Sequence, residues 1–208
     1  MILGVALVLA ARSTREEAIA PFTGDHWHNG VEFYDCGTVL PALAGERSPS
    51  GIHTHSDNLI HIEPSNSAES GENARFGVWL NAAGATVTPS AITAPDYAPI
   101  EVSGGCDGEP AEIVAARWDL FAEGGPVMIG DVVTDDFASI RFLENAQAIT
   151  VAKVPVGEPP PPPSQVIIDA VSTNTGLGPL GSGGGLDLAP TTVPADDMSG
   201  GDSPHEDG

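Results

Sequence analysis

The chain has very few positive charges. Its 208 residues include seven Lys and Arg against 29 Asp and Glu, which gives a formal charge of -22, and Lys153 is the single lysine. A surface of this sign repels phosphate backbones and anionic lipid headgroups, so we expect no nucleic-acid partner and no membrane contact outside the N-terminal segment. Such acidity also suits a protein kept soluble in a salty or extracellular medium.

The apolar run at residues 1–11 ends at Arg12 and is shorter than the roughly 20 residues that a membrane-spanning helix needs. It also lacks the basic residues that precede the apolar part of a signal peptide. We therefore interpret residues 1–20 as a truncated signal sequence or membrane anchor, with a buried N-terminal helix as the alternative. The first interpretation predicts an extracytoplasmic protein, secreted or anchored at the cell envelope.

Cysteine is scarce, with Cys36 and Cys106 as the two examples, and the Cys-x-x-Cys spacing of zinc ribbons and thiol oxidoreductases is absent. Outside the cytoplasm the two residues would most simply form a disulfide, which would stabilise the fold by about 4 kcal/mol in the chain-entropy model. Two buried free thiols are the alternative.

Common catalytic motifs are also missing. The sequence has no Gly-x-Ser-x-Gly elbow, Walker loop, His-Glu-x-x-His or dinucleotide-binding glycine motif at a strand-to-helix junction. Its acidic pairs, such as Asp135-Asp136, are adjacent, whereas a glycosidase needs two carboxylates across a cleft. Apart from the histidines described below, nothing favours an enzyme.

Proline divides the chain into three parts. Five consecutive prolines at 159–163 predict a stiff polyproline spacer, so we place a globular domain at 21–157. Residues 158–208 have one apolar patch, at 166–168, and are otherwise rich in Gly, Ser, Pro, Thr and Asp. We expect them to form a Pro-rich spacer and a disordered acidic tail, which is a candidate for binding a protein partner. The sequence gives no oligomeric state.

Short β-rich runs between turn residues predict strands. The expected strands are 31–36, 59–62, 112–121, 139–143 and 148–154, with the last two forming a hairpin across the turn at 144–147.

One helix is expected over 68–83, with Gly84 as a left-handed C-terminal cap and Asn66 and Glu69 at the spacing of a capping box. Phe76, Leu80 and Ala83 share one helical face and predict core packing. Two strands, a helix and three strands indicate an α+β fold with a small mixed β-sheet packed on one helix. A β-grasp-like order fits this pattern, and other α+β folds stay open.

Histidine is the feature most informative about function. Five of the six histidines lie in one short stretch, as His26, His28, His53, His55 and His61. Four of them form two His-x-His pairs, and in an extended segment both imidazoles of a pair project to one side. Together the pairs supply enough ligands for tetrahedral zinc or tetragonal copper(II), with His61 as an optional member. Three carboxylates could accept a hydrogen bond from a metal-bound histidine or bind the metal themselves: Asp25, Asp57 and Glu63.

Three uses of these imidazoles remain open: metal binding, a hydrogen-bonded structural or pH-sensitive cluster, and acid-base catalysis. We favour a noncatalytic extracytoplasmic domain that binds copper or zinc. The alternatives are an envelope-associated interaction module with structural histidines and, less favoured, a metal-dependent oxidoreductase or hydrolase. The run 51–55 is similar to a copper/zinc superoxide dismutase motif, and cupins also use His-x-His, but both need a late histidine. None lies between His61 and His205, so we assign neither family.

Several segments together resemble a group of uncharacterised, membrane-anchored or secreted actinobacterial proteins. The segments are Asp25-His-Trp-His28, Gly51-Ile-His-Thr-His55, Leu59-Ile-His-Ile-Glu-Pro64, Ser139-Ile-Arg-Phe142 and Pro159-Pro-Pro-Pro-Pro-Ser164. The pattern in that group reads His-Thr-His-Gly-Asp-Gly and then Ile-His-Ile-His-Pro. Here Ser56 and Asn58 replace the two glycines, and Glu63 stands at the second histidine. The resemblance implies a compartment and an architecture and brings no activity.

Overall fold

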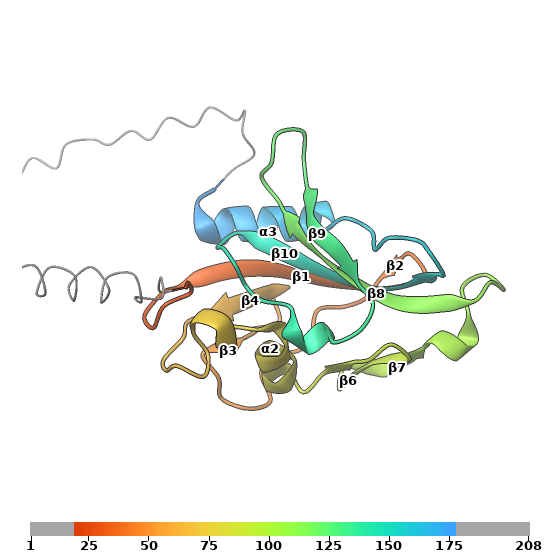
Figure 1. Ribbon diagram of the computed structural model, residues 1–208, viewed down its shortest axis with the longest axis horizontal. Coiled ribbons are helices and arrows are strands. Elements are labelled where there is room, and N and C mark those ends of the chain that lie inside the picture. Colours follow the sequence, from red (N-terminus) through yellow and green to blue (C-terminus); the bar gives the residue numbers. More distant parts are fainter. Residues whose placement is uncertain (1–18, 178–208) are drawn as a thin grey trace, which may run out of the picture.

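A mixed seven-stranded sheet forms the middle of the molecule, with one helix on each face (Figure 1). The structure, a computed structural model, describes residues 19–177. The strands of this sheet are β1 (Trp27–Asp35), β2 (Thr38–Val39), β3 (Ile52–His53), β4 (Leu59–Ile62), β8 (Ala111–Asp119), β9 (Val127–Val133) and β10 (Gln147–Pro155). Their order is β3-β4-β1-β10-β8-β9, with β2 paired to β1. Among the described strands of this sheet, β1 and β10 pair in parallel and the other pairs are antiparallel. The expected α+β class with a mixed sheet is confirmed.

The remaining elements lie mostly below the sheet in Figure 1. They are helix α2 (Phe76–Ala83), a second sheet of β5 (Thr86–Val87), β6 (Ala91–Ala94) and β7 (Tyr97–Glu101), and the short 3-10 helices η1 (Gly71–Asn73), η2 (Val102–Gly104) and η3 (Phe137–Ser139). Helix α3 (Gln165–Thr175) covers the opposite face of the main sheet.

The larger core lies between the main sheet and α2. Trp79 of α2 stacks between Phe33 of β1 and Phe76, with ring centroids 6.2 and 5.2 Å apart. Leu80 and Ala83 are also buried, so the predicted core face of this helix is confirmed.

The start of this helix was predicted wrongly. Residues 68–70 precede the 3-10 turn η1, and the α-helix begins only at Phe76. Asn66 accepts a hydrogen bond from the Ala68 amide and donates its side-chain amide to Glu69, but both residues lie well before the N-cap of α2 at Arg75, so the pair forms no capping box for this helix. At the other end the prediction holds, because Gly84 has φ 70° and its amide bonds to the carbonyl groups of Asn81 and Leu80.

The prediction of a single helix is also wrong, because α3 lies beyond the expected domain end at residue 157. Its Ile167 and Val171 are fully buried against Leu59 and Ala148 of the sheet. The apolar patch at 166–168 is therefore part of the core, and burying each such side chain contributes about 1.5–3 kcal/mol. Residues 178–208, the rest of the predicted tail, and residues 1–18 of the predicted leader lie outside the described residues.

The strands predicted at 31–36, 59–62, 112–121 and 148–154 correspond to β1, β4, β8 and β10. The hairpin expected between 139–143 and 148–154 is wrong. Ser139 belongs to η3, Arg141 forms an isolated bridge with Arg75, and β10 pairs with β1 and β8.

The predicted disulfide between Cys36 and Cys106 is present, with Cα atoms 5.5 Å apart. It joins the end of β1 to the segment before β8, across a sequence separation of 70 residues. A disulfide fits an extracytoplasmic location. Within residues 19–177, neither helix has the length and apolar character that crossing a membrane would require.

Candidate metal centre

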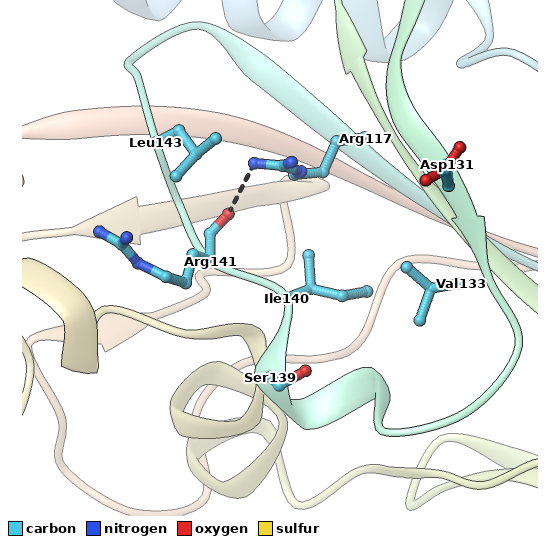
Figure 2. Close-up of a pocket in the computed structure, with 7 residues that line it drawn as sticks. All are labelled: Arg117, Asp131, Val133, Ser139, Ile140, Arg141 and Leu143. Atoms are coloured by element: carbon cyan, nitrogen blue, oxygen red, sulfur yellow. Dashed lines mark hydrogen bonds between the residues drawn. The ribbon is translucent and has the colours of Figure 1, made fainter.

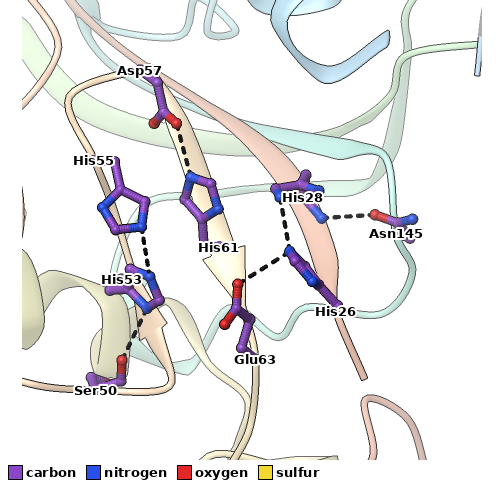
Figure 3. A network of polar contacts seen from close by, with 9 residues as sticks. All are labelled: His26, His28, Ser50, His53, His55, Asp57, His61, Glu63 and Asn145. Atoms are coloured by element: carbon purple, nitrogen blue, oxygen red, sulfur yellow. Dashed lines mark hydrogen bonds and ion pairs between the residues drawn. The ribbon is translucent and has the colours of Figure 1, made fainter. Parts of the chain in front are cut away.

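Three neighbouring strands bring three histidines into one row. His28 of β1 lies opposite His61 of β4, and His61 lies opposite His53 of β3. The rings of His28 and His61 meet edge to face, with centroids 4.8 Å apart. All five predicted histidines gather here, on the sheet face that also carries α3, and we call them the histidine cluster (Figure 3).

Side-chain alternation explains why each His-x-His pair points one way. Trp27, between His26 and His28, packs against the core on the opposite face of the sheet. Thr54, between His53 and His55, is likewise buried. Each pair then presents Nε2 to Nε2: the separation is 3.2 Å for the first pair and 3.0 Å for the second. The prediction that both imidazoles of a pair project to one side is confirmed.

Three members of the cluster are placed to share one ion. One ligand-capable nitrogen from each of His26, His28 and His61 lies within 4.8 Å of the others, and we call this set the triad. Two nitrogens bound to one metal at about 2.0–2.1 Å lie about 2.9–3.4 Å apart when the nitrogen-metal-nitrogen angle is between the square and the tetrahedral value. The His26–His28 separation already falls in that range.

Glu63 lies on the ligand side of the triad. Its Oε1 is 3.1 Å from His26 Nε2, the same nitrogen that faces His28. A carboxylate behind the ring would contact Nδ1 instead. Glu63 is therefore placed to act as a direct oxygen ligand beside the two imidazoles.

Asp57 holds the His61 ring by a hydrogen bond to its Nε2. His61 is 8% exposed, and its Nε2 donates to Asp57 Oδ2 at 2.8 Å. A neutral ring that donates from Nε2 keeps its lone pair on Nδ1. This carboxylate-histidine contact orients the ring, as is usual behind metal-binding histidines.

His53 is fixed in the same manner by a backbone carbonyl. The oxygen of Ser50 can only accept, so the 3.0 Å contact with His53 Nδ1 places the proton on that nitrogen. In the neutral ring the lone pair is then on Nε2, which faces His55.

Electrostatics in the cluster favour a neutral imidazole at His28 and an ionised carboxylate at Asp57. Burial lowers the pKa of His28, and the neighbouring rings of His61 and His26 lower it further. Burial raises the pKa of Asp57, but hydrogen bonds from His61 and the Leu59 amide outweigh this and hold the pKa below its ordinary value. Neutral imidazole is the form that binds metals.

Asp25 is the predicted residue that the structure separates from the histidines. Its carboxylate accepts a hydrogen bond from the Phe22 amide at 2.7 Å, and within residues 19–177 it has no hydrogen bond to a histidine. It therefore shapes the turn before β1.

Sequence reasoning missed three supporting residues. Ser50 orients His53 as described above, and Glu69 accepts hydrogen bonds from the Ser50 hydroxyl and the Gly51 amide. Asn145 accepts from the His28 amide at 2.8 Å. Its position in the predicted turn at 144–147 was visible, but its contact with β1 depends on the pairing of distant strands.

A separate pocket of about 280 Å³ lies on the other face of the main sheet (Figure 2). Its lining residues are Arg117, Asp131, Val133, Ser139, Ile140, Arg141 and Leu143. Burial lowers the pKa of Arg117, and the charge of Arg141 lowers it further. With two guanidinium groups and one carboxylate, this pocket has no transition-metal ligand set.

Comparison of the chain with protein-family models, with curated proteins and with solved structures finds no match. Function must therefore be argued from the histidine cluster itself.

Proposed function

We propose that this chain is a noncatalytic extracytoplasmic domain that binds a divalent transition metal, copper or zinc, through the histidine cluster. The observation that carries the proposal is the triad, in which nitrogens from β1, from the residue just before it and from the paired strand β4 approach one another within 4.8 Å. Imidazole nitrogen suits both metals, and Glu63 offers an oxygen as a fourth ligand.

The ring contacts favour this function over a purely structural cluster. A structural histidine satisfies its nitrogens with backbone or carboxylate groups. In the cluster, one nitrogen each of His53, His61 and His26 has such a contact, but the Nε2 atoms of each His-x-His pair also face one another. Paired Nε2 atoms on adjacent side chains are the arrangement that a shared cation would hold.

The extracytoplasmic part of the proposal is supported by the Cys36–Cys106 disulfide, since such bonds persist in oxidising compartments. Secretion or anchoring at the envelope would follow if residues 1–20 act as a leader. Fractionation of the native host, with alkylation in the presence and absence of reductant, tests both points. A cytoplasmic protein with two reactive thiols would contradict them.

We also propose that the sheet is β-grasp-like. Two strands, a helix and three strands follow one another as β1, β4, α2, β8, β9 and β10, and the first and last strands pair in parallel at the centre. The second sheet, β5 to β7, is then an insertion between the helix and the third strand. An experimental structure with a different strand order would contradict this assignment.

Metal analysis of the full chain, purified without an affinity tag, tests the main proposal. We expect bound copper or zinc and a higher melting temperature on adding either metal to the metal-free protein, because a ligand that binds only the folded state stabilises it. A His26→Ala/His28→Ala variant should lose the triad's ion. His205→Ala, outside the described residues, is the matched control for removing a histidine. Absence of bound metal together with an unchanged melting temperature would overturn the proposal.

A further inference from the structure

The His53–His55 pair forms a distinct feature within the histidine cluster. Its Nε2 atoms are 3.0 Å apart, and its rings are nearly perpendicular, with centroids 4.7 Å apart. The first pair, His26 and His28, has a similar centroid distance but belongs to the triad. The question is whether the second pair adds ligands to the same ion or holds another.

The geometry separates the pair from the triad. Within residues 19–177, the triad is the one group of three or more potential ligands that meets the 4.8 Å limit, and neither His53 nor His55 extends it. His61 lies between the two pairs, with its ring centroid 4.6 Å from that of His55 and 4.8 Å from that of His28 (Figure 3). An ion held by the triad is therefore screened from the second pair by the His61 ring.

The second pair is also preorganised. The Ser50 carbonyl fixes the tautomer of His53 so that its lone pair faces His55. Ser50 and Gly51 are held in turn by the Glu69 carboxylate, with donor-acceptor distances of 2.9 and 2.8 Å. A hydrogen-bonded partner behind a ligand is what positions histidine in metal sites.

From these observations we propose that the His53–His55 pair is a second site for a divalent transition metal, preferentially copper(II). The proposal rests on the function proposed above and deepens it from one bound ion to two. With metal-nitrogen bonds of about 2.0–2.1 Å, nitrogens 3.0 Å apart subtend an angle of about 95° at the metal, nearer to the square angle than to the tetrahedral one. That angle suits tetragonal copper(II) better than tetrahedral zinc.

The second site is open, whereas the first is partly enclosed. His55 is exposed and His53 is half-buried, so water or an external donor can complete the coordination. Two protein ligands bind an ion less tightly than three with a carboxylate beside them. Repulsion between the two ions is offset by the nearby carboxylates of Asp57 and Glu63, both in contact with cluster histidines. The second ion therefore binds in a later, weaker step and exchanges more readily.

Copper(II) titration of the metal-free full chain, with stoichiometry read by native mass spectrometry and affinity by calorimetry, tests this assignment. We expect two equivalents in two steps for the unaltered chain. His53→Ala/His55→Ala should keep the tight equivalent and lose the weak one, and His26→Ala/His28→Ala should do the reverse. Copper bound to the latter variant should show an electron paramagnetic resonance spectrum with two nitrogen ligands. His205→Ala should leave both steps unchanged, and circular dichroism checks that each variant folds.

The outcomes distinguish the two proposals. One equivalent that is lost in both double variants means a single shared centre, which overturns the second site and keeps the metal-binding function. Two equivalents retained in His53→Ala/His55→Ala place the weak ion elsewhere and also overturn it. No copper binding by the unaltered chain overturns the second site, and the same result with zinc overturns the proposed function itself.

Discussion

Two polar positions on the same face of β1 have opposite surroundings. Glu32 is buried and accepts hydrogen bonds from the Tyr34 hydroxyl and from both the amide and hydroxyl of Ser164, at 2.6–2.8 Å. His28, four residues earlier, faces other imidazoles. The first group is satisfied within the protein and ties the start of α3 to the sheet. At His28, by contrast, the ring nitrogens of neighbouring histidines point at one another, so they are available to bind a metal ion.

Gly30 marks the boundary between these regions. A Cβ atom at this position would clash with Ile167 Cγ2, so only glycine allows α3 to pack directly on β1. The helix covers the sheet from Glu32 to Gly30, and the histidine cluster begins at the next position on this face, His28. This face of β1 therefore supports the packing of α3 near Glu32 and Gly30 and supplies candidate ligand atoms near His28.

The substitution Glu32→Ala is the strongest test of this contrast between Glu32 and His28. It leaves the Ser164 amide and hydroxyl without their acceptor, so we expect the free energy of unfolding to fall by about 3 kcal/mol, measured by urea denaturation. Metal stoichiometry should not change, because no ligand is touched. Glu144→Ala, at an exposed glutamate, is the control. A loss of bound metal without a loss of stability would reverse the assigned roles.

Gly30→Ala should cost about 2 kcal/mol in unfolding free energy, because the added methyl group overpacks the contact between β1 and α3. The double variant Gly30→Ala/Ile167→Ala should lose less than the sum of its single variants, since it removes the clashing atom. Gly104→Ala, whose nearest neighbour would be Lys153 Nζ at 3.8 Å, is the control. Additive losses in the double variant would show that α3 does not rest on Gly30.

The substitution Asp57→Asn tests the histidine cluster. The fold should persist, because asparagine keeps an oxygen for the Leu59 amide, but His61 loses its carboxylate acceptor. Removing such a partner typically lowers metal affinity by about 10–100-fold, which calorimetry with zinc can measure. Asp25→Asn is the matched control, since the Asp25 carboxylate accepts a hydrogen bond from the Phe22 amide and, within residues 19–177, none from a cluster histidine. Equal effects of the two substitutions would contradict the role of Asp57.

The sequence was sufficient for features with local causes. Alternation placed both rings of each His-x-His pair on one side, and a glycine at 84 ended α2 in a left-handed cap. The Cys36–Cys106 bond followed from there being only two cysteines. Each of these depends on neighbouring residues or on a count.

Features that depend on long-range pairing could not be read in this way. β10 looked like half of a hairpin with 139–143, but its parallel partner β1 lies more than 100 residues earlier in the chain. The same pairing problem hid the central position of His61, which is set by the registers of β4 with β1 and β3. Helix α3 was missed because 166–168 is too short an apolar run to predict a helix until the sheet face beside Gly30 receives it.

The smallest effect should come from Glu69, which supports the second histidine pair from a distance. Burial raises its pKa, but hydrogen bonds from Gly51, Ser50 and Ser65 outweigh this and lower the pKa from 4.5. A lowered folded-state pKa means that Glu69 stabilises the fold above about pH 4.5 and that this contribution is lost as the pH falls through the folded-state value.

We expect Glu69→Gln to reduce the free energy of unfolding by about 1 kcal/mol at neutral pH, because its amide group would face donors instead of accepting from them. The difference between variant and unaltered chain should shrink as the pH falls through the lowered folded-state pKa of Glu69, because both side chains are neutral below it. Glu72→Gln, at an exposed glutamate nearby, controls for the loss of one charge. A weaker second copper step in Glu69→Gln, but not in Glu72→Gln, would show that the Glu69 carboxylate positions the His53–His55 pair through Ser50. An unchanged step would show that His53 stays correctly oriented without this carboxylate.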